Sequence, residues 1–298
     1  MKKQLQGGAM LLLATVIWGS AFVSQSIAMD HMGPFTFQAI RSFLAVIGMI
    51  PVILIFDFFK QDGKNFFCRW ADPRLWKAGV LCGLPLFLAC NLQQVGLVEI
   101  DPGKSGFLTA MYIIIVPIIG IFRKKKPTIM IPISVAIAVI GLYFLSFAGV
   151  AKINLNDLLT LGCAFFFAVQ ITFVDMFANN VDPLRLNAIQ ASVCALLSAV
   201  VMCFTEHPTW TGIAASVLPL AHVGFLSMGL AYSLQILGQR DLEPSAASLI
   251  MSMESVFALI CGILLAKEDL SGWKLLGCLL IFVAVILSQI PVRKRASV

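Results

Sequence analysis

The chain has 298 residues, of which 59% are hydrophobic and only 12% are charged, and its formal net charge is +6 at pH 7. Soluble globular proteins carry about 25% charged residues, so a chain this apolar lacks the polar surface that water requires. The composition excludes a soluble protein and predicts that lipid surrounds most of the molecule.

Ten apolar runs follow one another along the chain, each close to the length of about 20 residues that a bilayer-spanning helix needs. We expect spans at 9–28, 34–56, 77–98, 104–122, 129–149, 157–178, 184–204, 213–237, 244–266 and 272–290. The longest polar link, 57–76, is too short for a separate domain. Lys2 and Lys3 precede the first run, as in a signal peptide, but that run is longer than a signal core and nine more follow it. We therefore expect it to be retained as a helix.

The basic residues predict the orientation of these spans. With a cytoplasmic N-terminus, 16 of the 21 Lys and Arg residues fall on inside segments, and Arg41 lies within a span. The outside segments hold only Lys104, Lys152, Lys267 and Lys274. This positive-inside bias indicates that the basic residues set the orientation of the spans in the membrane. Because this accounts for the positive net charge, we expect no nucleic-acid partner. We predict cytoplasmic termini and a bacterial plasma (inner) membrane location, with the lipid bilayer as the surrounding partner.

No motif for a cofactor or a metal emerges from the sequence. Seven of the eight cysteines fall in apolar runs, where Cys acts as a small hydrophobe, and no CxxC pair occurs. The segment "PGKS" at 102–105 resembles the end of a phosphate-binding loop, but Val98 stands where that loop requires Gly. We expect neither a cofactor nor a metal, and an ATP-driven pump is disfavoured.

Two internal matches indicate a duplicated unit. "GPFTFQAIRSF" from Gly33 matches "DPLRLNAIQAS" from Asp182 at a shift of 149 residues. "ACNLQQVGLVEIDPGKSG" from Ala89 matches "AYSLQILGQRDLEPSAAS" from Ala231 at a shift of 142. We divide the chain into repeats at 1–149 and 150–298, each with five spans. An odd number of spans reverses the direction of entry, so the sequence predicts two inverted five-helix repeats, an architecture typical of secondary transporters.

The sequence resembles the drug/metabolite transporter superfamily, in its ten-helix group with two EamA repeats. The segments that carry the resemblance are "WGSAFVSQSIA" (18–28), "PFTFQAIRSFLA" (34–45), "LQQVGL" (92–97), "GFLTAMYIIIVPIIGIF" (106–122), "DLLTLGCAFFFAVQI" (157–171), "YSLQILGQ" (232–239) and "ASLIMSMESVFALICGILLAKE" (247–268). Ser255 departs from the family pattern, which has Pro after the acid of the ninth helix. The resemblance implies export or exchange of small metabolites, often amino acids, through a central cavity between the halves.

Polar residues inside the spans must face protein or water, because unpaired polar groups are costly in hydrocarbon. They concentrate on the first, third, fourth, sixth, eighth and ninth spans, whereas the fifth and tenth spans are almost bare. We expect the bare spans at the periphery and the others around a central cavity. The predicted substrate-binding residues are Trp18, Asn91, Gln94, Tyr112, Gln170, Tyr232, Gln235 and Glu254.

Glu254 is the charged residue that most needs an explanation. It is the eleventh residue of the span 244–266, close to the midplane, and its repeat counterpart is Tyr112. Three roles are open: binding of a substrate amine, transport-coupled proton transfer, or a neutral or paired structural group between helices. His222 is a second candidate for proton coupling, with a hydrogen bond to a neighbouring helix as its alternative.

Arg41 and Asp175 are predicted as members of a structural ion pair or a gate. Arg41 has three open interpretations: a pair with an outer acid such as Glu99, a bond to a backbone carbonyl, or binding of a substrate carboxylate. Asp175 lies near the cytoplasmic end of the sixth span, where capping or gating costs less than deep burial.

We conclude from the sequence that the chain is a secondary transporter, exporting or exchanging a small polar or amphipathic metabolite such as an amino acid by alternating access. One alternative in the same class is a flippase for a lipid-linked substrate, which needs a lateral opening between helices. A membrane enzyme that uses Glu254 and His222 as acid and base is a second alternative, and a noncatalytic scaffold is a third. The oligomeric state stays open.

Overall fold

The structure is a computed structural model that describes residues 2–59, 66–124, 129–146, 154–266 and 271–288. Every regular element in these ranges is a helix, and the fold is that of an all-helical membrane protein with two repeats. The first half holds α1 (Lys2–Met29), α2 (Pro34–Phe59), α3 (Phe66–Trp70), α4 (Pro73–Gly96), α5 (Pro102–Ala110), α6 (Tyr112–Phe122) and α7 (Met130–Ser146). The second half holds α8 (Leu155–Phe177), α9 (Pro183–Thr205), α10 (Trp210–Ala215), α11 (Val217–Ala221), the π-helix η1 (His222–Ala231), α12 (Tyr232–Gln239), α13 (Pro244–Met251), α14 (Glu254–Ala266) and α15 (Gly272–Ser288).

The ten expected spans correspond to ten apolar helical segments. Eight described segments are long and apolar enough to cross a membrane, and two shorter apolar helices, Met130–Phe144 and Gly272–Ser288, stand where the fifth and tenth spans are expected. The predicted ends of those two spans, 147–149 and 289–290, lie outside the described residues. The link at 57–76 is not uniformly extended, because α2 continues to Phe59 and α3 forms inside the link.

Proline and short polar residues determine where several helices begin. Pro73 and Pro183 occupy the first turn of α4 and α9, where the missing N–H has no helical partner to lose. The side chain of Asp182 accepts from the backbone N–H groups of Leu184 and Arg185 at 3.1 and 3.2 Å, which caps α9. The start of α9 has a match in the first half, because Pro34, the repeat mate of Pro183, begins α2.

Two carboxylates at helix ends show that α2 and α9 run antiparallel. Glu206, directly after α9, accepts from the backbone N–H groups of Phe35 and Thr36 at 3.0 and 2.8 Å. At the opposite ends of the same helices, Asp57 forms an ion pair with Arg185. Glu206 and Asp57 are repeat mates at the shift of 149, as are Arg185 and Thr36. Equivalent helices that pack side by side in opposite directions establish that the two repeats are inverted.

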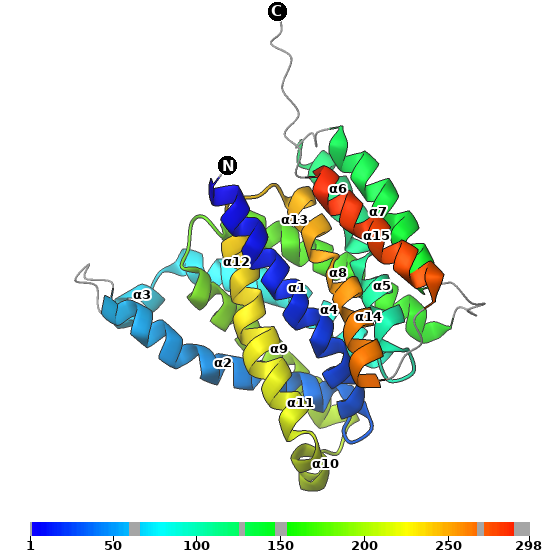
Figure 1. Ribbon diagram of the computed structural model, residues 1–298. Helices are drawn as coiled ribbons and strands as arrows, with labels where there is room; N and C mark the ends of the chain where they lie inside the picture. The colour runs from blue at the N-terminus through cyan, green and yellow to red at the C-terminus, as the bar shows by residue number, and fades with distance from the viewer. Residues whose placement is uncertain (1, 60–65, 125–128, 147–153, 267–270, 289–298) are drawn as a thin grey trace, which may run out of the picture.

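The two halves interleave rather than forming separate domains. The most extensive contacts pair α4 with α8 and α9, α2 with α9, α1 with α14, and α7 with α15, each across the repeat boundary. Helices α7 and α15, which form the fifth and tenth spans, lie side by side at one edge of the bundle (Figure 1). Their lack of polar residues predicts this peripheral position. Phe144 stacks on Trp273 with ring centroids 5.3 Å apart, which places the end of α7 against the start of α15.

The fourth and ninth spans are each interrupted at equivalent positions, which their sequences do not predict. The fourth span breaks at Met111, between α5 and α6, and the ninth breaks at Ser252 and Met253, between α13 and α14. Met111 (φ −59°, ψ −12°) and Ser252 (φ −63°, ψ −14°) retain right-handed dihedral angles, so each interruption is a tight turn rather than an unwound segment. The eighth span contains the ten-residue π-helix η1 in place of a regular helix. Irregular turns of this kind concentrate at functional sites.

Gly19 tests the close packing of α1 against α14. A Cβ atom at Gly19 would lie 2.4 Å from Cβ of Phe257 and 2.7 Å from the backbone nitrogen of Ala258. We expect Gly19→Ala to lower the free energy of unfolding by about 1–3 kcal/mol, the usual cost of overpacking, and thermal unfolding in detergent measures it. Gly120→Ala is the matched control, since no atom lies within 4 Å of its added Cβ. Equal melting temperatures for the two variants would contradict the packing described.

Candidate functional site

A partly open cavity lies between helices of both repeats. Six of the eight predicted substrate-binding residues line it: Trp18, Tyr112, Gln170, Tyr232, Gln235 and Glu254. The remaining lining residues are Phe22, Gln25, Arg41, Gln93, Thr109, Phe167, Ile171, Ser227 and Met251. The lining is polar as well as apolar.

Glu254 and Tyr112 meet across the cavity at the two helix interruptions. Tyr112 begins α6 and Glu254 begins α14, and the Tyr112 hydroxyl donates to Glu254 Oε1 at 3.0 Å. Glu254 is 5% exposed, and its second carboxylate oxygen has no hydrogen-bond partner in the part of the chain that the structure describes.

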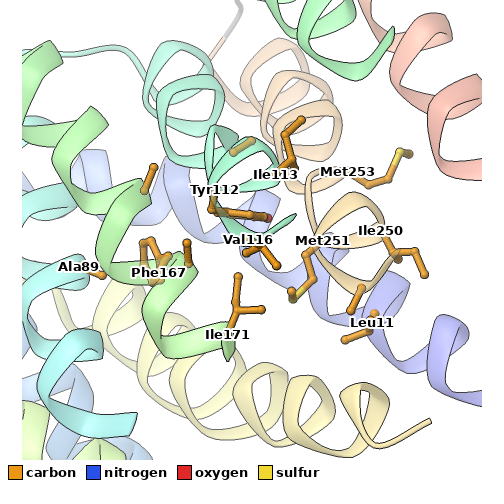
Figure 2. Close-up of a cluster of buried hydrophobic side chains, with 14 of the residues drawn as sticks. Leu11, Ala89, Tyr112, Ile113, Val116, Phe167, Ile171, Ile250, Met251 and Met253 are labelled. Carbon is orange, nitrogen blue, oxygen red and sulfur yellow. The ribbon is translucent and has the colours of Figure 1, made fainter. Parts of the chain in front are cut away.

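Apolar and aromatic side chains complete the walls around this pair. Figure 2 shows Tyr112, Phe167, Ile171 and Met251 gathered where α6, α8 and α13 meet. On another side of the cavity, the rings of Trp18 and Tyr232 lie 5.1 Å apart at an interplanar angle of 59°. The buried indole nitrogen of Trp18 has no partner among the described residues, so a hydrogen-bond donor remains unused beside the cavity. Aromatic faces and one polar group of this kind suit a partly apolar ligand with a charged group.

A chain of buried amides joins α12, α8 and α9. Gln235 donates to Gln170 at 3.1 Å, Gln170 donates to Gln190 at 3.3 Å, and Gln190 donates to Asn187 at 2.8 Å. Asn187 then donates to the carbonyl oxygen of Gly229 in η1 at 2.8 Å. Both ends of the Gln170 amide are therefore occupied. The chain leaves Gln235 Oε1 as a buried acceptor without a described partner.

Arg41 lies toward the end of the bundle that holds the turn between α1 and α2. Its guanidinium donates to Gln25 Oε1 at 2.6 Å and lies 5.8 Å from the ring centroid of Phe37. The suggested pairing with Glu99 is wrong, because Glu99 is exposed and accepts from Asn156 on α8. The proximity of Gln25 and Arg41 brings two cavity residues together that the sequence analysis did not pair.

Four predicted residues lie outside the cavity lining. Asn91 donates to Ser198 Oγ and to a carbonyl oxygen of its own helix, both at 2.8 Å. His222 contacts the hydroxyls of Ser20 and Ser24 at 3.2 and 2.8 Å, linking η1 to α1. The other two are Gln94, which is fully buried, and Asp175, which forms an ion pair with Arg123 at 3.3 Å.

The sequence carries a signal for only some of the lining residues that were not predicted. Gln25, Gln93 and Thr109 are polar residues within apolar spans, which is the signal that identified their neighbours. Gln93 donates to Thr109 at 2.9 Å and joins α4 to α5. Ser227 lines the cavity from η1, and no sequence signal marks that π-helix. Among the described residues, no group of three His, Cys, Asp or Glu side chains has the proximity of metal ligands.

Inverted helical repeats around a partly open, polar cavity define the class of this protein as a multi-pass integral membrane transporter. More particularly, the chain belongs to the EamA-like transporter family, which matches residues 5–147 and 154–289. The family match thus covers both repeats.

Individual relatives extend over nearly the whole chain. An uncharacterized transporter of Archaeoglobus fulgidus is 31% identical over 296 residues, covering 97% of this chain and 88% of the relative. The uncharacterized transporter YoaV of Bacillus subtilis is 23% identical, covering 96% and 97%. The threonine/homoserine exporter RhtA of Escherichia coli is 26% identical over 254 residues, covering 84% and 81%. One crystal structure superposes with a TM-score of 0.77 at 16% identity over 95% of this chain and 96% of that chain, which shows the shared fold.

The amide chain yields a stability prediction. Gln190→Leu removes one acceptor and one donor from buried partners, and each unsatisfied group costs about 1–3 kcal/mol. We expect a clear fall in the thermal midpoint in detergent. Gln94→Leu is the matched control, since both amide atoms of buried Gln94 lack partners among the described residues, and it should leave the midpoint unchanged or raise it. The reverse order of the two midpoints would refute the arrangement of amides.

Proposed function

We propose that this protein is a secondary transporter that exports or exchanges a small amine-bearing metabolite of the amino-acid class. The single observation that carries the proposal is Glu254, a buried carboxylate that faces the cavity between the repeats and keeps one oxygen unbonded. A buried carboxylate is stabilised by a cation, and the ammonium group of a metabolite is such a cation.

Other groups around the cavity suit the same ammonium group. The unpartnered Gln235 Oε1 is a second acceptor on the lining, at the end of the amide chain. The Trp18 and Tyr232 rings offer aromatic faces that attract cations. The relative from Escherichia coli is named a threonine/homoserine exporter, which agrees with a substrate that carries an amine.

The arrangement of the helices supports alternating access. Inverted repeats have two related conformations, and exchanging them between the halves exchanges the open side of the cavity. The interruptions at Met111 and at Ser252–Met253 place a bendable turn beside Tyr112 and Glu254 in each repeat. Movement at these turns would change the Tyr112–Glu254 hydrogen bond, which couples the state of Glu254 to the opening of the cavity. The cytoplasmic termini and the bacterial inner membrane remain part of this proposal.

The membrane-enzyme alternative lacks its acid–base pair in this geometry. Glu254 lines the cavity, whereas His222 lies outside its lining, and two serine hydroxyls contact both ring nitrogens of His222. Ser20 also donates to the carbonyl oxygen of Ile17 at 2.8 Å, so it accepts from the Nε2–H of His222. A neutral His222 then accepts from Ser24 at Nδ1, and this satisfied arrangement favours a structural role that links α1 to η1.

Glu254→Gln tests the proposal in sealed proteoliposomes, because it preserves shape and the acceptor for Tyr112 while removing the charge. We expect counterflow of the best substrate among the twenty amino acids and simple primary amines to fall at least about tenfold, since a charge-assisted hydrogen bond contributes about 1.5–3 kcal/mol. Glu99→Gln, at an exposed acid outside the cavity, is the control and should retain flux. Normal flux in Glu254→Gln would refute amine binding by this group.

The same vesicles separate amine binding from proton coupling. Wild-type flux that rises with an imposed pH gradient, and a Glu254→Gln variant that still exchanges substrate but ignores the gradient, would assign proton transfer to Glu254. Loss of exchange in the absence of any gradient would assign substrate binding. Normal transport with a lowered melting temperature would leave Glu254 as a structural group.

A further inference from the structure

Arg41 is a buried cation without a carboxylate partner among the described residues. It is 3% exposed and lines the same cavity as Glu254. Its guanidinium donates to the neutral amide of Gln25, faces the ring of Phe37, and has the thiol of Cys90 nearby. The Nε atom of Arg41 has no hydrogen-bond partner among the described residues. None of these neighbours is a carboxylate, the usual counter-ion of a buried guanidinium.

The equivalent position in the second repeat shows that the fold does not need a charge there. Arg41 corresponds to Gln190 at the shift of 149 residues. Gln190 is fully buried and belongs to the amide chain, where it accepts from Gln170 and donates to Asn187. A neutral amide therefore satisfies this site in one repeat, whereas the other repeat keeps an uncompensated cation beside the cavity. Packing alone does not account for the charge.

The geometry points to Arg41, held in place by Gln25, as the subsite for a carboxylate group of the transported molecule. This inference rests on the proposed transport function and deepens it, because it assigns the residue that binds the carboxylate end of the substrate. Guanidinium binds carboxylate through two parallel N–H···O bonds, a geometry that ammonium groups lack. The unpartnered indole nitrogen of Trp18 is a further donor on the lining of the same cavity.

The resulting cavity has one acidic and one basic residue, each held by a neutral partner. Glu254 accepts from Tyr112 at 3.0 Å, and Arg41 donates to Gln25 at 2.6 Å. A zwitterion compensates both charges at once, whereas a simple amine leaves the guanidinium buried without a counter-ion. Free amino acids should therefore be accepted, and their methyl esters and the corresponding decarboxylated amines should be rejected.

Gln25→Glu is the decisive variant, because it places a carboxylate of nearly the same shape at the 2.6 Å contact with Arg41. The new side chain supplies the missing charge from within the protein. We expect the thermal midpoint to hold or rise, and flux of the best amino acid in proteoliposomes to fall at least tenfold. Arg41→Gln removes the cation instead, and Arg74→Gln, at an exposed arginine outside the cavity, is the matched control.

Competition measures the recognition of the carboxylate directly. In the wild type and in Arg74→Gln, the methyl ester should inhibit flux of the best amino acid at least tenfold more weakly than the free acid does. In Arg41→Gln that ratio should approach one. Wild-type flux in Gln25→Glu, or an unchanged ratio in Arg41→Gln, would overturn the subsite and leave Arg41 a structural group.

A readout without transport separates this inference from the proposed function. The thermal midpoint in detergent is compared between sodium acetate and sodium chloride at equal ionic strength. If no amino acid or amine crosses the wild-type vesicles, the proposed function fails, and a midpoint raised by acetate in the wild type but not in Gln25→Glu still supports the carboxylate subsite. No acetate effect in the wild type, together with no flux, would reject both.

Discussion

Lipid offers no hydrogen bonds, and this constraint governs where every polar group of the molecule is placed. Most buried polar side chains meet it through a partner on another helix. Asn91 bonds to Ser198 across α4 and α9, and the amide chain from Gln235 to Asn187 ties three segments of the second repeat together. The few polar atoms that remain without a described partner beside the cavity then become informative. They include atoms of Trp18, Gln235, Arg41 and Glu254, and we propose that a ligand completes their bonding.

The inverted duplication places polar groups at equivalent helix ends in both repeats. The carboxylates of Asp57 and Glu206 are repeat mates, and each neutralises the start of the partner helix in the antiparallel pair α2–α9. Such symmetric contacts keep the scaffold equivalent in both halves. The cavity residues have diverged instead, so that Tyr112 opposes Glu254 and Arg41 corresponds to Gln190. The two repeats thus have equivalent residues where helices are held together and different residues at the proposed binding site.

The sequence predicts the spans and the repeats well, because both depend on quantities that a single sequence carries. Hydrophobic length locates the ten helical segments, and recurring Pro and Asp residues set their starts. The position of Glu254 beside the Tyr112 hydroxyl follows the repeat alignment closely. Six cavity residues were found by the same reasoning, since polar side chains in apolar helices face inward.

What the sequence missed depends on the rotation of helices and on tertiary contacts. Gln93 and Gln94 are neighbours in the chain, yet only Gln93 lines the cavity, because a step of one residue turns the side chain to another face of α4. The π-helix η1 shifts the face of the eighth span further, since each π turn holds more residues than an α turn. No Pro or Gly stands at Met111, Ser252 or Met253, so nothing local marks those interruptions.

Arg41 and Glu254 are not paired with each other, so the empty site does not have to break an ion pair before it binds a ligand. Had Arg41 and Glu254 paired with each other, the cavity would satisfy itself, and a substrate would have to break a buried ion pair before binding. Each is held instead by a neutral group, Gln25 or Tyr112, which fixes its position without cancelling its charge. Positioned charges of this kind reduce the ordering cost of binding. Because both charges lie in a low-dielectric interior, their attraction for the two ends of a zwitterion exceeds the attraction that water would permit. Under the proposed function, such a site binds a ligand that compensates both charges and rejects one that compensates only one of them.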